Sequence, residues 1–241
     1  MGKKLLIWLL IILPVVPGAS QPGMDTSFVA AALKNTVALY DEALGSQSRL
    51  YNGARYVAPE YSLEEHPFYH SDDWLVGAAL YDGEHFENIA LMYDIHSGTL
   101  ITEHLPSGHP IQLVKGKLQN FTIAGHYFER IENESVSNSL AQSGFYDILY
   151  AGETRVIARR QKLVREQISA AQIERFYDER TRWFILKNGV YFPLRNKTSL
   201  LKVLADKKTE LKRFIRKDRD RFSIDREALF KSVAEFYDSL K

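Results

Sequence analysis

The feature that most constrains the fold is a series of two-residue turn signals between residues 74 and 194. Asp82-Gly83, Ser97-Gly98 and Asn188-Gly189 each separate short runs rich in apolar and aromatic residues, and such pairs tolerate the positive φ angles of tight hairpin turns. We expect strands over residues 74–81, 85–93, 99–104, 111–114, 121–131, 145–150, 155–163, 183–187 and 190–194. Roughly nine short strands in series favour a curved antiparallel β-meander, as an open sheet or an incomplete barrel, over any βαβ arrangement.

Helical periodicity flanks this region on both sides. Residues 26–44 carry an apolar residue at every third or fourth position, which predicts an N-terminal helix ending before Gly45. Residues 199–217 and 225–240 show the same spacing, and Asp225 is a suitable N-cap for the second of these helices. A meander with an N-terminal helix and two C-terminal amphipathic helices belongs to the α+β class.

We predict a single mature domain over residues 21–241. It comprises the N-terminal helix region (21–49), a loop and the meander (50–195), and a basic helical tail (196–241). The loop over residues 50–73 is rich in aromatic residues and is interrupted by Pro59 and Pro67. Because each amphipathic helix needs an apolar partner, we expect the tail to dock on the sheet rather than to be detachable.

The first 20 residues have the three parts of a secretory signal peptide. Lys3 and Lys4 precede an apolar stretch over residues 5–16, and Gly18-Ala19-Ser20 supplies small residues before Gln21. The alternative is an uncleaved membrane anchor, but spanning a bilayer takes about 20 apolar residues. The sequence therefore predicts export with cleavage after Ser20.

The composition excludes several classes of site. The chain has no cysteine, so it has no disulfides, no thiolate metal site and no cysteine nucleophile. It contains no Gly-x-Ser-x-Gly element and no glycine-rich phosphate loop. We predict no cofactor.

Charge is unevenly distributed along the chain. Residues 196–241 hold 13 Lys and Arg against 8 Asp and Glu, whereas residues 21–195 are net acidic. Acids alternate with the bases over residues 207–221, which favours a salt-bridged, solvent-exposed face. Peripheral contact of residues 207–221 with an anionic membrane surface is the alternative, and export argues against a nucleic-acid partner.

The densest group of chemically capable side chains lies at residues 64–74. We take six of them as a candidate binding site: His66, Tyr69, His70, Asp72, Asp73 and Trp74. His66 and His70 have the i, i+4 spacing of two metal ligands on a helix, which raises the alternative of a metal-assisted hydrolase using His66, His70 and Asp72 or Asp73. Pro67 disfavours helix at His66, and no His-Glu-x-x-His order supplies a general base.

Several short motifs are spread over most of the mature chain. They include Leu50-Tyr51-Asn52-Gly53 with Tyr56, His66-Pro67-Phe68-Tyr69, Tyr81-Asp82-Gly83, Tyr93-Asp94, Gly144-Phe145-Tyr146, Lys187-Asn188-Gly189-Val190-Tyr191-Phe192, Ser199-Leu200-Leu201 and Asp206-Lys207-Lys208. In these the chain resembles a set of uncharacterised exported proteins of Bacteroidetes-type bacteria. The resemblance implies a periplasmic or outer-membrane-associated location in the cell envelope, and it brings no catalytic residues.

Together these observations predict an exported, non-catalytic protein that binds an envelope protein or a small ligand. The metal-assisted hydrolase is the alternative.

Overall fold

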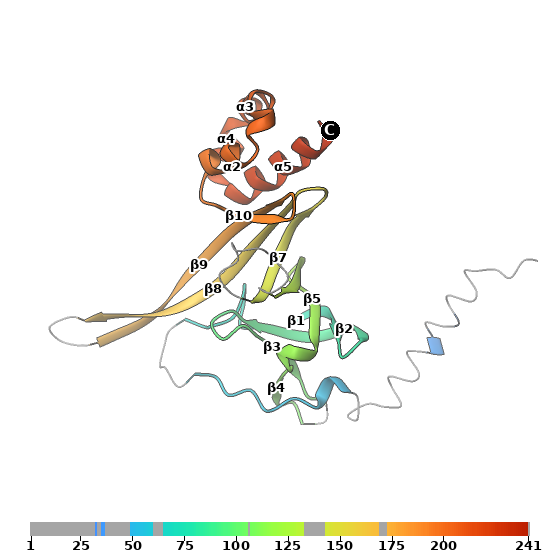
Figure 1. Ribbon diagram of the computed structural model, residues 1–241. Helices are drawn as coiled ribbons and strands as arrows, with labels where there is room; N and C mark the ends of the chain where they lie inside the picture. Colours follow the sequence, from blue (N-terminus) through green and yellow to red (C-terminus); the bar gives the residue numbers. More distant parts are fainter. Residues whose placement is uncertain are drawn as a thin grey trace, which may run out of the picture. The chain divides into compact units, whose positions relative to one another are not determined.

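The computed structural model describes residues 32, 35–36, 49–59, 65–105, 107–132, 143–168 and 173–240 (Figure 1). The chain divides into two units, Met1–Leu44 and Gly45–Lys241. The predicted signal peptide lies outside the described residues, as does nearly all of the predicted helix over residues 26–44. No helix in the described ranges is both long enough and apolar enough to cross a membrane.

The second unit is built on one open sheet of ten antiparallel strands, in the order β10-β9-β8-β7-β6-β5-β1-β2-β3-β4. The strands are β1 (Leu75–Tyr81), β2 (Glu84–Asp94), β3 (Thr99–Glu103), β4 (Pro110–Gln112), β5 (Leu118–Ile123), β6 (His126–Ile131), β7 (Gly144–Ala151), β8 (Arg155–Ile168), β9 (Ile173–Lys187) and β10 (Val190–Leu194). After β4 the chain passes through the single 3-10 turn η3 (Lys115–Lys117) and returns to the free side of β1, where it adds β5. The prediction of an α+β fold with an antiparallel sheet is confirmed, and the sheet is open.

The predicted strand over residues 121–131 is wrong in one respect. Residues Ala124 and Gly125 adopt φ angles of 51° and 77° and separate β5 from β6, so the segment is a hairpin. Alanine rarely adopts positive φ, because its Cβ then crowds the backbone. The residue type at position 124 therefore does not predict a turn.

Strands β8 and β9 are much longer than predicted. Their ladder continues without interruption from Arg155 opposite Leu186 to Ile168 opposite Ile173. Beyond Ala158 the two strands form a ribbon of their own (Figure 1). This ribbon buries little apolar surface, and most of its residues are charged or polar. Apolar alternation cannot reveal strands of this kind.

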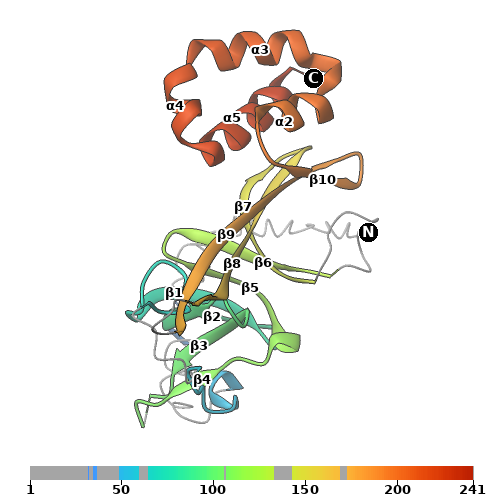
Figure 2. The same cartoon turned by 90° about the vertical axis from the view of Figure 1, so that its left-hand side faces the viewer.

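Four α-helices follow β10: α2 (Lys197–Val203), α3 (Lys208–Lys217), α4 (Arg219–Ile224) and α5 (Arg226–Ser239). The single helix predicted over residues 199–217 is wrong, because the backbone at Leu204 (φ −97°, ψ 43°) leaves the helical region and the 3-10 turn η5 (Ala205–Lys207) follows. The predicted N-cap is confirmed: the Asp225 carboxylate accepts a hydrogen bond of 2.9 Å from the amide of Ala228. Figure 2 shows the four helices gathered beside β10.

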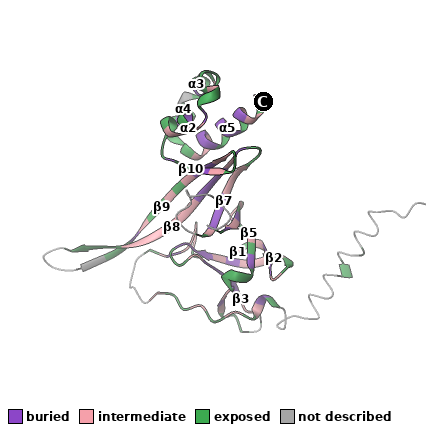
Figure 3. Cartoon of the chain, viewed as in Figure 1, coloured by how far each residue is buried: buried purple, intermediate pink, exposed green. Residues whose placement is uncertain are grey.

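The helices pack on the sheet through a continuous apolar core (Figure 3). Leu204, Leu211 and Phe230 are fully buried against Val156 and Ile185 of the sheet. Phe236 and Leu240, which the sequence also places on the apolar stripes, are only half-buried. A second core lies within the β1–β7 part of the sheet, where aromatic rings of Tyr93, Phe121, Phe128 and Phe145 pack on one another.

A polar contact reinforces the attachment of the helices. The Asp206 carboxylate accepts a hydrogen bond of 2.5 Å from Lys187 Nζ of β9 and one of 2.7 Å from Tyr237 Oη of α5. The hydrogen bond from Lys187 lowers the pKa of Asp206 to about 2. Through these two hydrogen bonds Asp206 links the hairpin β9–β10 to α5.

The Asn188-Gly189 turn provides a test of the sheet's turn chemistry. Asn188 and Gly189 adopt φ angles of 51° and 76°, so we expect Gly189→Ala to destabilise the fold by about 1 kcal/mol through backbone strain alone. Gly116→Ala is the matched control, because neither glycine has an atom within 4 Å of an added Cβ and only Gly189 has a positive φ. Urea unfolding followed by circular dichroism measures both variants. An equal effect of the two substitutions would contradict the role of the turn.

Candidate functional site

The loop residues chosen from the sequence do not form one site. Tyr69 points into the core, where its ring packs edge-on against Phe128 at 5.3 Å and against His126 at 5.7 Å. Burial raises the pKa of Tyr69 to about 12. The remaining five residues are exposed or half-buried and lie in the turn before β1.

The hydrogen bonds of these five residues are local. His66 Nδ1 accepts from the amide of Phe68 at 3.2 Å, and Asp73 accepts from the Ser71 hydroxyl at 2.9 Å. His70 adopts a φ of 66° and, like Asp72 and Trp74, is exposed. Within the part of the chain that the structure describes, no group of three His, Asp or Glu side chains could hold a metal ion. The metal-assisted hydrolase therefore has no geometric support among these residues.

The histidines of the sheet bind different partners. His96 Nδ1 lies 2.9 Å from the carbonyl oxygen of Lys162, and His104 Nδ1 lies 2.7 Å from the Ser107 hydroxyl. His126 Nδ1 lies 2.9 Å from Asp147 Oδ2. These three side chains act as hydrogen-bonded structural residues and do not converge.

The site that the structure does form begins where two strands separate. The β7–β8 ladder ends at Asp147 opposite Ala158, whereas the β6–β7 ladder continues to Gly144. Residues 144–146 of β7 therefore part from β8. Beyond this point the β2–β3 turn meets β8, and the amide of Lys162 donates a hydrogen bond of 3.3 Å to the carbonyl oxygen of Ile95.

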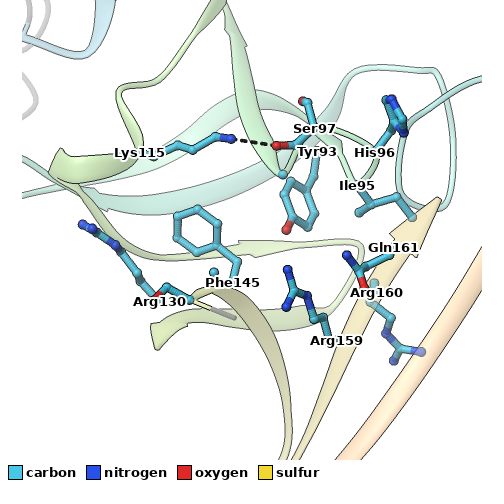
Figure 4. A pocket seen from close by; sticks show the side chains of 13 residues that line it. Tyr93, Ile95, His96, Ser97, Lys115, Arg130, Phe145, Arg159, Arg160 and Gln161 are labelled. Carbon is cyan, nitrogen blue, oxygen red and sulfur yellow. Dashed lines mark hydrogen bonds between the residues drawn. The ribbon is translucent and has the colours of Figure 1, made fainter. Parts of the chain in front are cut away.

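A pocket of about 240 Å³ fills the space between β7, β8 and the β2–β3 turn (Figure 4). We call it the wedge pocket. It is lined by Tyr93, residues 95–98, Lys115, Arg130, residues 143–145 and residues 159–161. Three elements distant in sequence thus enclose one small cavity.

The lining of the wedge pocket is strongly basic. Lys115, Arg130 and Arg159 contribute cationic side chains, and none of the described residues of the lining is Asp or Glu. Arg130 forms an ion pair with Glu132 at 2.8 Å, and Lys115 Nζ donates to the carbonyl oxygen of Ser97 at 2.7 Å. Arg159 forms no ion pair with a described carboxylate. Its guanidinium lies 5.8 Å from the centroid of the Tyr146 ring, and Figure 4 shows it pointing toward Tyr93.

Gly144 and Gly98 leave the cationic groups of Arg159 and Lys115 uncovered. A Cβ atom at Gly144 would lie 3.9 Å from Arg159 Nη2, and one at Gly98 would lie 3.9 Å from Lys115 Nζ. A longer side chain at either position would compete for the space in front of the cation. Both positions have positive φ, 158° at Gly144 and 68° at Gly98, which disfavours other residues there.

Aromatic side chains form the apolar wall of the wedge pocket. The rings of Tyr93 and Phe145 pack edge-on at 6.3 Å. Burial raises the pKa of Tyr93 well above its ordinary value, although the charge of Arg159 opposes this shift. The Tyr93 hydroxyl is therefore neutral at physiological pH and remains a hydrogen-bond donor.

The next residue of β8 points the other way, because successive side chains alternate between the faces of a strand (Figure 4). The Arg160 guanidinium donates to Asp147 Oδ2 of β7 at 2.5 Å and to Glu227 Oε2 of α5 at 2.8 Å. Asp147 is almost completely buried and Arg160 is nine-tenths buried. Burial alone would lower the pKa of Arg160, but the hydrogen bonds to Glu227 and Asp147 outweigh it and raise the pKa.

Two further side chains complete this group, which we call the Arg160 cluster. Trp183 Nε1 of β9 donates to Glu227 Oε1 at 3.1 Å, and His126 binds Asp147 as described above. Glu227 lies in the first turn of α5, where the helix dipole favours a negative charge. The Arg160 cluster therefore ties α5 to β7, β8 and β9 directly behind the wedge pocket.

Sequence reasoning missed the residues of the wedge pocket. The signal that could have found them is the Arg159-Arg160 pair inside a predicted strand, because adjacent strand residues face opposite sides and one of the two had to be buried or bind a partner. Lys115 and Arg130 carry no comparable signal, since they reach the pocket only through the return of the chain to β1.

Comparison with known proteins places no relative beside this chain: no protein-family model matches it, and neither a curated protein nor a solved structure does.

The Arg160 cluster predicts a large mutational effect. Arg160→Met leaves Asp147 buried without its cation, so we expect a loss of about 3–5 kcal/mol in the free energy of unfolding. The double variant Arg160→Met/Asp147→Leu should recover part of that loss, because it removes the uncompensated charge. Denaturant unfolding measures both.

The control for this experiment is an exposed ion pair of the same type. Arg165 lies 3.2 Å from Asp178 on the β8–β9 ribbon, and Arg165→Met should change stability by less than about 1 kcal/mol. A similar loss at Arg160 and Arg165 would show that the Arg160 cluster does not hold the helices on the sheet.

Proposed function

We propose that this chain is an exported, non-catalytic protein of the cell envelope that binds a small anionic ligand in the wedge pocket. The observation that carries the proposal is the presence of Lys115, Arg159 and the Glu132-paired Arg130 around one cavity whose described lining residues include no carboxylate. Holding cations together in a partly enclosed space costs free energy unless a counter-ion compensates them. A bound anion supplies that compensation.

The chemistry of the lining indicates an oxyanion. The guanidinium of Arg159 presents paired N–H donors that match the two oxygens of a carboxylate or phosphate group. Lys115 adds a second positive charge, and the neutral Tyr93 hydroxyl adds a donor. These groups recognise charge and oxygen geometry together.

The size and the aromatic wall narrow the ligand class. A volume of about 240 Å³ is below the range of pockets for drug-sized molecules, which begins near 300 Å³. The rings of Tyr93 and Phe145 suit an apolar or flat part of the ligand beside its anionic group. We therefore expect a small carboxylate or phosphate ester.

Two features of the sequence support the envelope location. The N-terminal residues have the organisation of a signal peptide, and the motifs resemble those of exported proteins of Bacteroidetes-type bacteria. The sequence contains no Gly-x-Ser-x-Gly element, no cysteine and no His-Glu-x-x-His order, which supports a binding role rather than catalysis.

Ligand-dependent stabilisation tests this function. Inorganic phosphate and benzoate, tested separately, distinguish a phosphate from a carboxylate site, and the matching anion should raise the Tm in proportion to ln(1 + [L]/Kd). Arg159→Met should weaken binding about 10- to 100-fold, because it removes a charge-assisted hydrogen bond. Differential scanning fluorimetry and calorimetry measure the two quantities.

Arg182→Met is the matched control, since Arg182 lies opposite Arg159 in the β8–β9 ladder and is exposed. It should leave the response to the anion unchanged. The proposal fails if neither anion stabilises the unmodified protein, or if Arg159→Met retains the full response, which would indicate a general salt effect.

A further inference from the structure

A groove on the outer side of the helices collects lysines from two elements. It is lined by Lys197 and Lys202 of α2 and by Lys208 and Lys212 of α3, together with Thr198, Leu201 and Ala205. We call the surface formed by these four lysines the lysine face. All four side chains are exposed, so their ammonium groups share one solvent-accessible depression.

Further cations continue this surface along α3. Lys208, Lys212 and Arg216 follow one another at intervals of four residues, which places them on one side of the helix. Leu211 and Ile215 of the same helix are buried in the core. The side of α3 that carries Leu211 and Ile215 therefore packs in the core, and the side that carries the cations is exposed to solvent.

The lysine face lacks the internal neutralisation that alternating acids suggested. Between residues 197 and 217 the only acids are Asp206 and Glu210, and Asp206 binds Lys187 and Tyr237 instead. None of the four lysines forms an ion pair with a described carboxylate, and the one ion pair found within residues 207–221 joins Arg221 to Asp218 at 3.8 Å. The predicted salt-bridged face is therefore not what the structure shows here.

From this arrangement we infer that the lysine face docks on an anionic lipid surface. Lysine ammonium groups bind phosphate headgroups as point charges, and several of them in a shared groove add their attraction to a negatively charged membrane. None of the described residues that line the groove is aromatic, so these residues offer no stacking platform of the kind that single-stranded nucleic acids use. Phe214, the aromatic residue of α3, is stacked on Phe236 at 4.3 Å instead.

This surface is independent of the wedge pocket. It lies on α2 and α3, whereas Tyr93, Lys115 and Arg159 belong to the sheet and η3. The anionic ligand of the pocket is a small molecule, and the ligand of the lysine face is an extended surface. Either inference can therefore fail without the other.

Vesicle sedimentation tests the inference. The full chain should partition onto phosphatidylcholine vesicles containing about one third phosphatidylglycerol more strongly than onto pure phosphatidylcholine vesicles, and salt at about 0.5 M should remove the difference. The triple variant Lys202→Gln/Lys208→Gln/Lys212→Gln should lose about 100-fold in that anionic component, at about fivefold for each lysine. Glutamine has a helix propensity close to that of lysine, so the helices should persist.

A matched variant removes the same charge elsewhere. Arg49, Arg55 and Arg182 are exposed and lie outside α2–α5, and replacing all three with Gln should leave most of the anionic component intact. The N-terminal segment is common to all proteins compared, so its contribution cancels. Arg159→Met should also bind vesicles normally, which separates this result from the function of the wedge pocket.

The inference is overturned by any of three results. These are equal binding to neutral and anionic vesicles, equal losses in the lysine and arginine triple variants, or tighter binding to duplex DNA than to anionic vesicles at the same salt concentration. An unchanged melting temperature in the lysine variant confirms that a loss of binding is not a loss of folding.

Discussion

The ion pairs of Arg160 with Asp147 and Glu227 hold together parts of the chain that no local interaction could connect. They join β7, β8 and the first turn of α5, with the Asp147 side chain almost completely buried, Arg160 nine-tenths buried and Glu227 29% exposed. A buried charge is stable only when its partners are fixed, so this contact demands a single position of the helices on the sheet. The apolar core contributes most of the stabilisation that comes from burial, and the Arg160 cluster fixes where the helices sit on the sheet.

The wedge pocket depends on the same contact. Asp147, which binds Arg160, is also the last residue at which β7 pairs with β8. Beyond it the two strands part, and Arg159 is left facing the opening. One pair of adjacent arginines thus has two uses: the second residue secures the fold, and the first is available to a ligand.

The sequence predicted most of the sheet because turn chemistry is local. Asp82-Gly83 and Asn188-Gly189 adopt the positive φ values that their residue types favour, and the Asp225 cap follows from one side chain and one amide. The turn at Ala124 was missed because alanine is an unusual residue for that conformation. The break at Leu204 was missed because it is set by burial of Leu204 and by the bonds of Asp206, both of which depend on tertiary structure.

The candidate site was less predictable for a physical reason. His66, His70, Asp72 and Asp73 were selected because they are close in sequence, yet the loop turns their side chains toward solvent or local partners. The wedge pocket forms where the β7–β8 ladder ends. The end of a ladder does not require particular residue types, so the sequence does not predict it. Lys115 and Arg159 are 44 positions apart and come together only because β5 returns to β1.

The long β8–β9 ribbon has a consequence for how copies of this protein behave in a crowded compartment. β10 pairs with β9 only over residues 183–187, and β7 pairs with β8 only as far as Ala158. Among the described residues, the rest of the ribbon has no neighbouring strand along its full length, and unpaired backbone edges invite other chains to add a strand. Charged side chains at Arg165, Glu166, Asp178 and Arg180 line this segment. The hydration of these charges discourages fibril-like stacking, so the charged composition that concealed these strands from sequence analysis also protects them from self-association.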